Sequence, residues 1–230
     1  MAASDYGHCY ASLFGASQEQ APIYGHLAIA RAGLEACVVS SWLNEPRIET
    51  VERVKRALCE LIYSAWEVKR LELEGDDKTA ELLASLMRIT DTLGWTLSDD
   101  RGKPRLDATR RPSVPLRIAE ILVGDRRREI GKVQWSYSSS VIHVTWYGIR
   151  QAVVEGPSDE VGIGPSIAMV GTQSKAVNAR SSCLLRTLRY AGTARRTLMG
   201  WIDDRWTEAC RQAENHENAL LKSIVASREE

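Results

Sequence analysis

The stretch between Pro22 and Pro46 constrains the fold most strongly, because it is almost entirely apolar. Proline suits the first turn of a helix and disfavours helix in the residue before it, so the two prolines bound a predicted helix over 23–43. Few side chains in this helix ionise: the Cys37 thiol, Tyr24, His26, Arg31 and Glu35. A helix this apolar must be covered on most sides by other elements. The chain should therefore build a bundle around it.

Breaker residues and helical periodicity divide the rest of the chain into further helices, and strand-type alternation is absent over any useful length. We expect an all-α fold of six or seven helices, with residues 1–19 as a flexible N-terminal arm and 20–230 as a single domain. The segment 95–113 is rich in turn residues and is expected to be an exposed basic loop. The other helices are predicted over 50–74, 77–93, 114–123, 130–154, 172–198 and 203–226.

Composition excludes several classes of protein. The 30 Lys and Arg balance the 30 Asp and Glu, so no global field favours nucleic acid or a membrane surface. Five cysteines without a CxxC pair favour free thiols in a reducing cytoplasm. No stretch is apolar enough to predict a membrane span, and no spacing matches a di-iron, zinc or phosphate-loop motif. We expect a cytoplasmic protein without metal or cofactor.

The predicted helix KVQWSYSSSVIHVTWYGIRQAV, residues 132–153, is the second helix that is expected to be buried on most sides. At 100° per residue, Trp135 and Trp146 fall on an apolar packing stripe. A separate stripe, here called the polar seam, carries groups that are cheap to bury only when they are hydrogen-bonded. The polar seam consists of Ser136, Ser140, His143, Tyr147 and Arg150.

The 23–43 helix offers a partner for the polar seam. Arg31 and Glu35 are spaced i,i+4 and should pair along the helix, at least partly buried. If the two helices face each other, these groups form one pocket. His143 would then act as acid or base and Arg31 and Arg150 as anion anchors. In the remaining roles, Glu35 would orient Arg31, Ser140 and Tyr147 would supply polar contacts, and Trp42 and Trp146 would stack on a planar ligand. The alternative is a hydrogen-bonded network that only fixes helix register.

Two motifs carry a resemblance. The stretch ARAGLEACVVSSWLNEPRIETVERVKRALCELIYSAWEVKRLE is similar to uncharacterised helical proteins of high-GC Gram-positive bacteria, as is the later group Ser139, His143, Thr145, Trp146 and Tyr147. More remotely, the arrangement resembles HEPN-type helical bundles, many of which are ribonucleases in toxin and defence systems. Their motif, Arg-x4-6-His, fails at His143, while Arg211 and His216 fit it.

Three functions follow as hypotheses. The leading one is an enzyme or ligand-binding protein that takes a small anionic molecule or a peptide in the pocket between 21–44 and 132–153, in bacterial secondary metabolism. The second is a HEPN-like RNA-binding or ribonuclease-type defence protein that uses the basic region 101–128. The third is a helical interaction module without catalysis. A homodimer is compatible with each.

Overall fold

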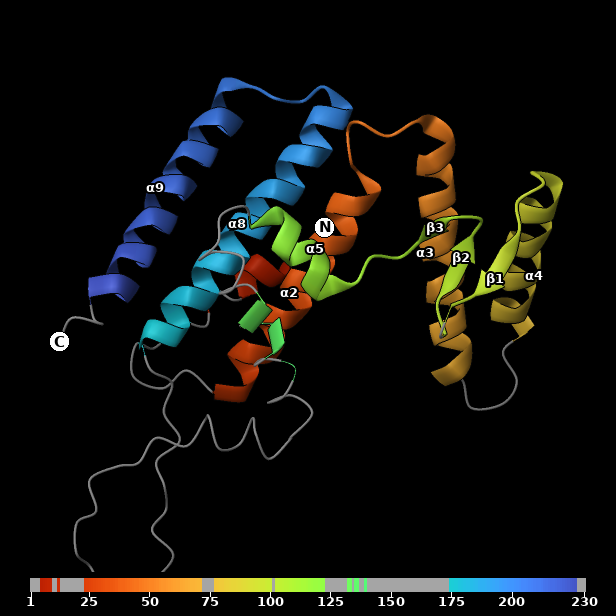
Figure 1. Cartoon of the computed structure of the whole chain (residues 1–230), viewed down its shortest axis with the longest axis horizontal. Coiled ribbons are helices and arrows are strands. Elements are labelled where there is room, and N and C mark those ends of the chain that lie inside the picture. The colour runs from red at the N-terminus through yellow and green to blue at the C-terminus, as the bar shows by residue number, and fades with distance from the viewer. Residues whose placement is uncertain are drawn as a thin grey trace, which may run out of the picture.

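The computed structural model describes residues 5–9, 12, 23–71, 77–100, 102–122, 132–133, 135–136, 139 and 174–226. These residues are mostly helical, which confirms the all-α class (Figure 1). A small three-stranded antiparallel sheet is the main exception. The helices are α2 (Ile23–Leu43), α3 (Thr50–Leu71), α4 (Asp77–Thr92), α5 (Val114–Ile121), α8 (Ser174–Met199) and α9 (Asp204–Ala226).

Four of these helices, α2, α5, α8 and α9, form what we call the bundle. The apolar run of α2 supplies much of its core, since Ala30, Leu34 and Val38 are fully buried against side chains of α5 and α8. Helix α9 packs along α8 on the other side (Figure 1). From Leu27 to Leu43 every residue except Ala28 is buried or half-buried, so the prediction that α2 is covered on most sides is correct.

The remaining elements form what we call the hairpin unit, in which α3 and α4 run antiparallel beside the sheet (Figure 1). Strand β1 (Leu97–Asp99) pairs with β2 (Pro104–Leu106), and β2 with β3 (Thr109–Arg110). Leu106 is fully buried in a second core cluster, which also contains Trp42, Cys59 and Ile62.

This sheet occupies part of the segment 95–113 that was expected to be a loop. Its strands are only two or three residues long, too short for alternation to be recognised in the sequence. Two tight turns reverse the chain. The backbone N–H of Gly102 donates to the Asp99 carboxylate at 2.6 Å, and Gly102 and Asp107 both have positive φ. Pro104, Leu106 and Thr109 then turn inward and are buried.

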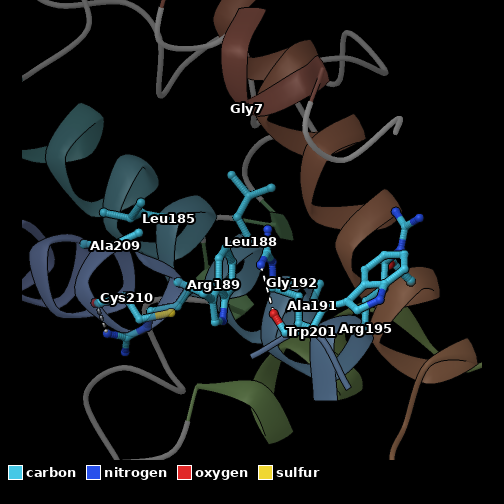
Figure 2. A pocket seen from close by; sticks show the side chains of 14 residues that line it. Gly7, Leu185, Leu188, Arg189, Ala191, Gly192, Arg195, Trp201, Ala209 and Cys210 are labelled. Carbon is cyan, nitrogen blue, oxygen red and sulfur yellow. Dashed lines mark hydrogen bonds between the residues drawn. The ribbon is translucent and has the colours of Figure 1, made fainter. Parts of the chain in front are cut away.

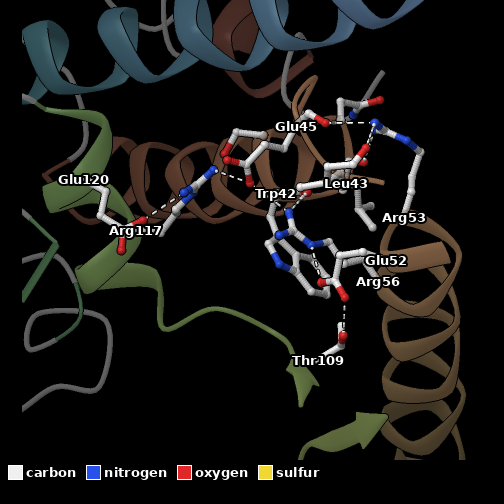
Figure 3. Close-up of polar contacts among 12 residues, drawn as sticks. Trp42, Leu43, Glu45, Glu52, Arg53, Arg56, Thr109, Arg117 and Glu120 are labelled. Carbon is white, nitrogen blue, oxygen red and sulfur yellow. Dashed lines mark hydrogen bonds and ion pairs between the residues drawn. The ribbon is translucent and has the colours of Figure 1, made fainter. Parts of the chain in front are cut away.

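The two units meet where α2 ends (Figure 3). The guanidinium of Arg56 on α3 donates to the carbonyl of Trp42 at 2.7 Å, and Arg53 donates to the carbonyl of Leu43 at 3.3 Å. The last carbonyls of a helix have no partner within it, so cations placed there satisfy them and complement the helix dipole. Across the junction, Arg117 of α5 pairs with Glu45 at 3.4 Å.

The described part of the N-terminal segment lies against the bundle. Residues 5–9 are helical, and Gly7 lies so close to α8 that a Cβ there would come within 2.8 Å of a Leu188 methyl carbon. Gly33 of α2 likewise lies against Leu184 and Tyr6. Glycine thus permits the close approach of this segment to α2 and α8.

Candidate functional site

The predicted pair on α2 is present. The Arg31 Nε lies 3.1 Å from the Glu35 carboxylate, and the side chains are 20% and 37% exposed, so the pair is partly buried as expected. The Arg31 guanidinium also lies over the ring of Trp135, 5.6 Å from its centroid. Trp135 packs against the bundle core, as its place on the predicted packing stripe required. The start of the 132–153 segment thus lies beside α2.

The other candidate residues of that pocket lie outside the described residues: Ser140, His143, Trp146, Tyr147 and Arg150. Their meeting with Arg31 and Glu35 stays a prediction. Ser136, the member of the polar seam that is described, is exposed. Trp42 is only 6% exposed and belongs to the hairpin-unit core, where the Arg56 guanidinium lies 5.4 Å from its ring centroid. Protein contacts therefore occupy most of its surface.

A cavity of about 600 Å³, which sequence reasoning missed, opens between α8 and α9. We call it the α8–α9 cavity. Leu185, Leu188 and Ala191 give it an apolar wall on α8, and Ala209 and Ala213 continue the wall on α9. Figure 2 shows Leu185 and Ala209 on one side and Trp201 and Arg195 on the other. Its size and apolar lining are those of a small-molecule site.

The charges at this cavity have one sign. Arg189, Arg195 and Arg196 line it, and among its described lining residues there is no Asp or Glu. Arg189 lies 3.3 Å from Glu214, and Arg196 donates to the carbonyl of Trp201 at 3.1 Å. Arg195 is exposed and has no carboxylate partner among the described residues. The cavity therefore presents an arginine that an anion can engage.

Local packing holds the aromatic wall in place. A Cβ at Gly192 would lie 2.6 Å from the Trp206 ring, so this ring rests directly on the backbone of α8. The Arg196 guanidinium lies 4.7 Å from the centroid of the same ring. Trp201 follows Gly200, whose φ of +67° ends α8, and remains 52% exposed. A fixed indole and an exposed one thus flank the arginines.

An ion-pair network supports the cavity from within the bundle. Glu217 of α9 is 1% exposed and accepts from Arg186 at 3.2 Å, while Arg189 lies 3.6 Å from it. A buried carboxylate is tolerable only with such partners. One sequence signal could have found the site, because α8 contains no Asp or Glu although it carries Lys175 and five arginines.

Glu35 lines a second cavity, of about 480 Å³, at the junction of the two units. Glu60 and Arg111 also line it and form an ion pair at 3.0 Å. Burial raises the pKa of the Glu60 carboxyl, although the charge of Arg111 opposes the shift. The Arg111 guanidinium also stacks 4.1 Å from the centroid of the Tyr63 ring.

The features behind the RNA hypothesis do not assemble within the described residues. In the basic region, Arg110, Arg111 and Arg117 pair with Asp100, Glu60 and Glu120 respectively. Arg211 and His216 are both exposed on α9, but five residues along a helix turn them about 140° apart. Arg211 is instead held by Glu208 at 2.7 Å.

Within the part of the chain that the structure describes, His, Cys, Asp and Glu side chains do not gather in threes as a metal site requires, and each helix is too short or too polar to span a bilayer. No protein-family model, curated protein or solved structure matches the chain.

Proposed function

We propose that this protein binds a small molecule that has a flat apolar body and one anionic group, and that the α8–α9 cavity receives it. The observation that carries the proposal is the lining: three arginines and two tryptophans on an apolar wall, without a carboxylate among the described lining residues. The ligand class is the one the sequence predicted, but the site is different.

Each part of the lining has a role in this proposal. Arg195 forms the charge-assisted contact with the anionic group, because a guanidinium matches a carboxylate or phosphate with two parallel hydrogen bonds. The exposed ring of Trp201 stacks on the flat body of the ligand. Leu185, Leu188 and Ala209 receive its apolar edge.

The pocket predicted around His143 stays a second candidate, with one observation in its favour. Trp135, the start of that segment, meets α2 at Arg31, and Glu35 one turn further on lines a cavity. In this version His143 exchanges a proton with a bound substrate, Glu35 orients Arg31, and the protein is an enzyme. We also propose a cytoplasmic location, since all five thiols are free.

A fluorescent probe tests the first candidate directly. Anilinonaphthalene sulfonate has a flat apolar body and one anionic group, and N-phenylnaphthylamine has nearly the same body without charge. We expect the sulfonate to bind more tightly, and Arg195→Gln to weaken it about tenfold, which corresponds to one charge-assisted hydrogen bond. The neutral probe should bind both proteins equally.

Arg205→Gln is the matched control, because Arg205 is exposed on α9 and lies outside the cavity lining. Equal sulfonate affinity in Arg195→Gln and in the unaltered protein would refute the proposal. Native mass spectrometry then separates the two candidates. A co-purified ligand that is lost in Arg195→Gln belongs to the α8–α9 cavity, and one that is lost in His143→Ala alone belongs to the predicted pocket.

A further inference from the structure

The hairpin unit leaves an apolar face in contact with water. On α3, the exposed positions Val54, Leu61 and Val68 are spaced seven residues apart and are 41%, 52% and 48% exposed. Such spacing keeps them on one side of the helix. Thr50, Ala57 and Ser64 complete this stripe, and all three are exposed and uncharged.

Helix α4 carries a matching stripe. Leu82 and Ile89 are 51% and 45% exposed, and Leu93, just past the end of the helix, is 47% exposed. Half-buried Ser85 lies between the first two, and the exposed Lys78, one turn before Leu82, marks the polar end of the stripe. On both helices the stripe is rotated away from the buried face by a similar angle and in the same rotational sense. The buried Leu58 comes four residues after Val54 on α3, and the buried Leu86 comes four residues after Leu82 on α4.

In an antiparallel pair, a displacement in the same sense places both stripes on the same side of the pair. On α3 this side lies opposite the sheet, because Lys55 and Cys59, which contact Asp107 and Thr109, are about 140° away from the stripe. The sheet thus covers one face of the α3–α4 pair, and the other face is an exposed apolar layer, here called the hairpin face.

We propose that the hairpin face binds the hairpin face of a second copy of this chain, so that two α3–α4 pairs form a four-helix bundle. The face is about 25 Å long and two helices wide, which gives roughly 500 Å² in projection and more in accessible surface. Standard interfaces bury about 800 Å² per partner, while the largest apolar patch on a monomer is typically 300–600 Å². The apolar face alone lies near the upper end of the monomer range, so a dimer has to bury the polar rim of the face as well to reach a standard interface.

Charges at the edge of the face favour the same partner in one orientation. Glu81 and Arg88 are both exposed and lie seven residues apart along the edge of the α4 stripe. A two-fold axis perpendicular to the helices makes α4 antiparallel to its copy. Each Glu81 then lies opposite the Arg88 of the other copy, which gives two favourable pairs at the rim.

The test is the oligomeric state in sedimentation equilibrium from low micromolar to about 100 µM. We expect the unaltered protein to dimerise. Leu61→Glu places one negative charge from each copy at the centre of the interface, and it should raise the dimer dissociation constant at least about 100-fold. Leu116→Glu is the matched control, since Leu116 is 58% exposed on α5, away from the hairpin face, and this variant should dimerise normally.

Charge exchange tests the orientation. Glu81→Arg and Arg88→Glu should each weaken the dimer, and the double variant should restore it. Circular dichroism checks that every variant keeps its helices. A monomeric unaltered protein, a Leu61→Glu variant that still dimerises, or a Leu116→Glu variant that dissociates equally would overturn the proposal, and a double variant that stays weak would overturn the antiparallel orientation.

Discussion

Replacing Arg56 should cost more stability than replacing any ordinary surface arginine, because this side chain joins the two units. It is 13% exposed, donates to the Trp42 carbonyl at 2.7 Å, and pairs with Glu45 at 2.8 Å and Glu52 at 3.0 Å. In Arg56→Ala the carbonyl and the Trp42 ring lose their cation. Glu45 keeps Arg117, and Glu52 keeps the Thr109 hydroxyl.

The magnitude follows from these contacts. A hydrogen bond from a charged donor is worth about 1.5–3 kcal/mol, and the cation–π contact with Trp42 adds about 1 kcal/mol. Since both acids keep another partner and are about a third exposed, their residual penalty is small. We therefore expect Arg56→Ala to lower the free energy of unfolding by about 3 kcal/mol. Arg56→Lys keeps the positive charge but loses the several N–H donors of the planar guanidinium, so it should lower the free energy of unfolding by roughly half of that.

Urea unfolding followed by tryptophan fluorescence measures this. With a slope of about 2–3 kcal/mol per molar, the midpoint should fall by about 1 M. Arg70→Ala is the control, because Arg70 is 72% exposed and pairs only with Glu67 among the contacts described, so its loss should cost less than about 0.5 kcal/mol. If Arg56→Ala and Arg70→Ala unfold at the same urea concentration, the contacts of Arg56 do not stabilise the junction between the two units.

Two further predictions concern buried positions of the protein. Gly192→Ala should lower the stability by about 1–3 kcal/mol and shift the tryptophan emission, because the added Cβ would meet the Trp206 ring at 2.6 Å; unchanged thermal unfolding would contradict this contact. Burial raises the pKa of Cys37 and Cys183 to about 12 and that of Cys59 to about 11. At pH 8, iodoacetamide should therefore modify exposed Cys9 first and leave these three until the protein unfolds, as peptide mass spectrometry can show; rapid labelling of Cys37 would disprove its burial.

Helix positions could be predicted well because their ends depend on local chemistry. Pro22 and Pro46 bound α2, and Gly94 and Gly200 follow the ends of α4 and α8 with φ of +70° and +67°. The pair Arg31 and Glu35 was also found from spacing alone, since four residues along a helix bring two side chains together.

The α8–α9 cavity could not be found in this way, because it depends on how two helices pack. Gly192 lies inside α8 and forms no turn, so its sequence position gives no reason for a glycine. The reason is the close approach of Trp206 from another helix. The small sheet was missed for a related reason, since strands of two or three residues are fixed by the burial of Leu106 and not by their own pattern. The absence of Asp and Glu from α8 is the one local signal of this cavity that the sequence carries.

The chain leaves the bundle after α2 and returns at α5. The ion pair between Glu45 and Arg117 joins the two points where the chain leaves and returns. The residues between them pack in a core cluster that the bundle joins only through the end of α2, at Trp42 and Leu43. They can therefore open as one cooperative segment while α2, α8 and α9 stay folded. Amide protons of α3 and α4 should then exchange together, at a lower opening free energy than those of α2 and α8. Arg53 and Arg56 set the size of that difference, so the end of a single helix determines whether the molecule unfolds in one step or in two.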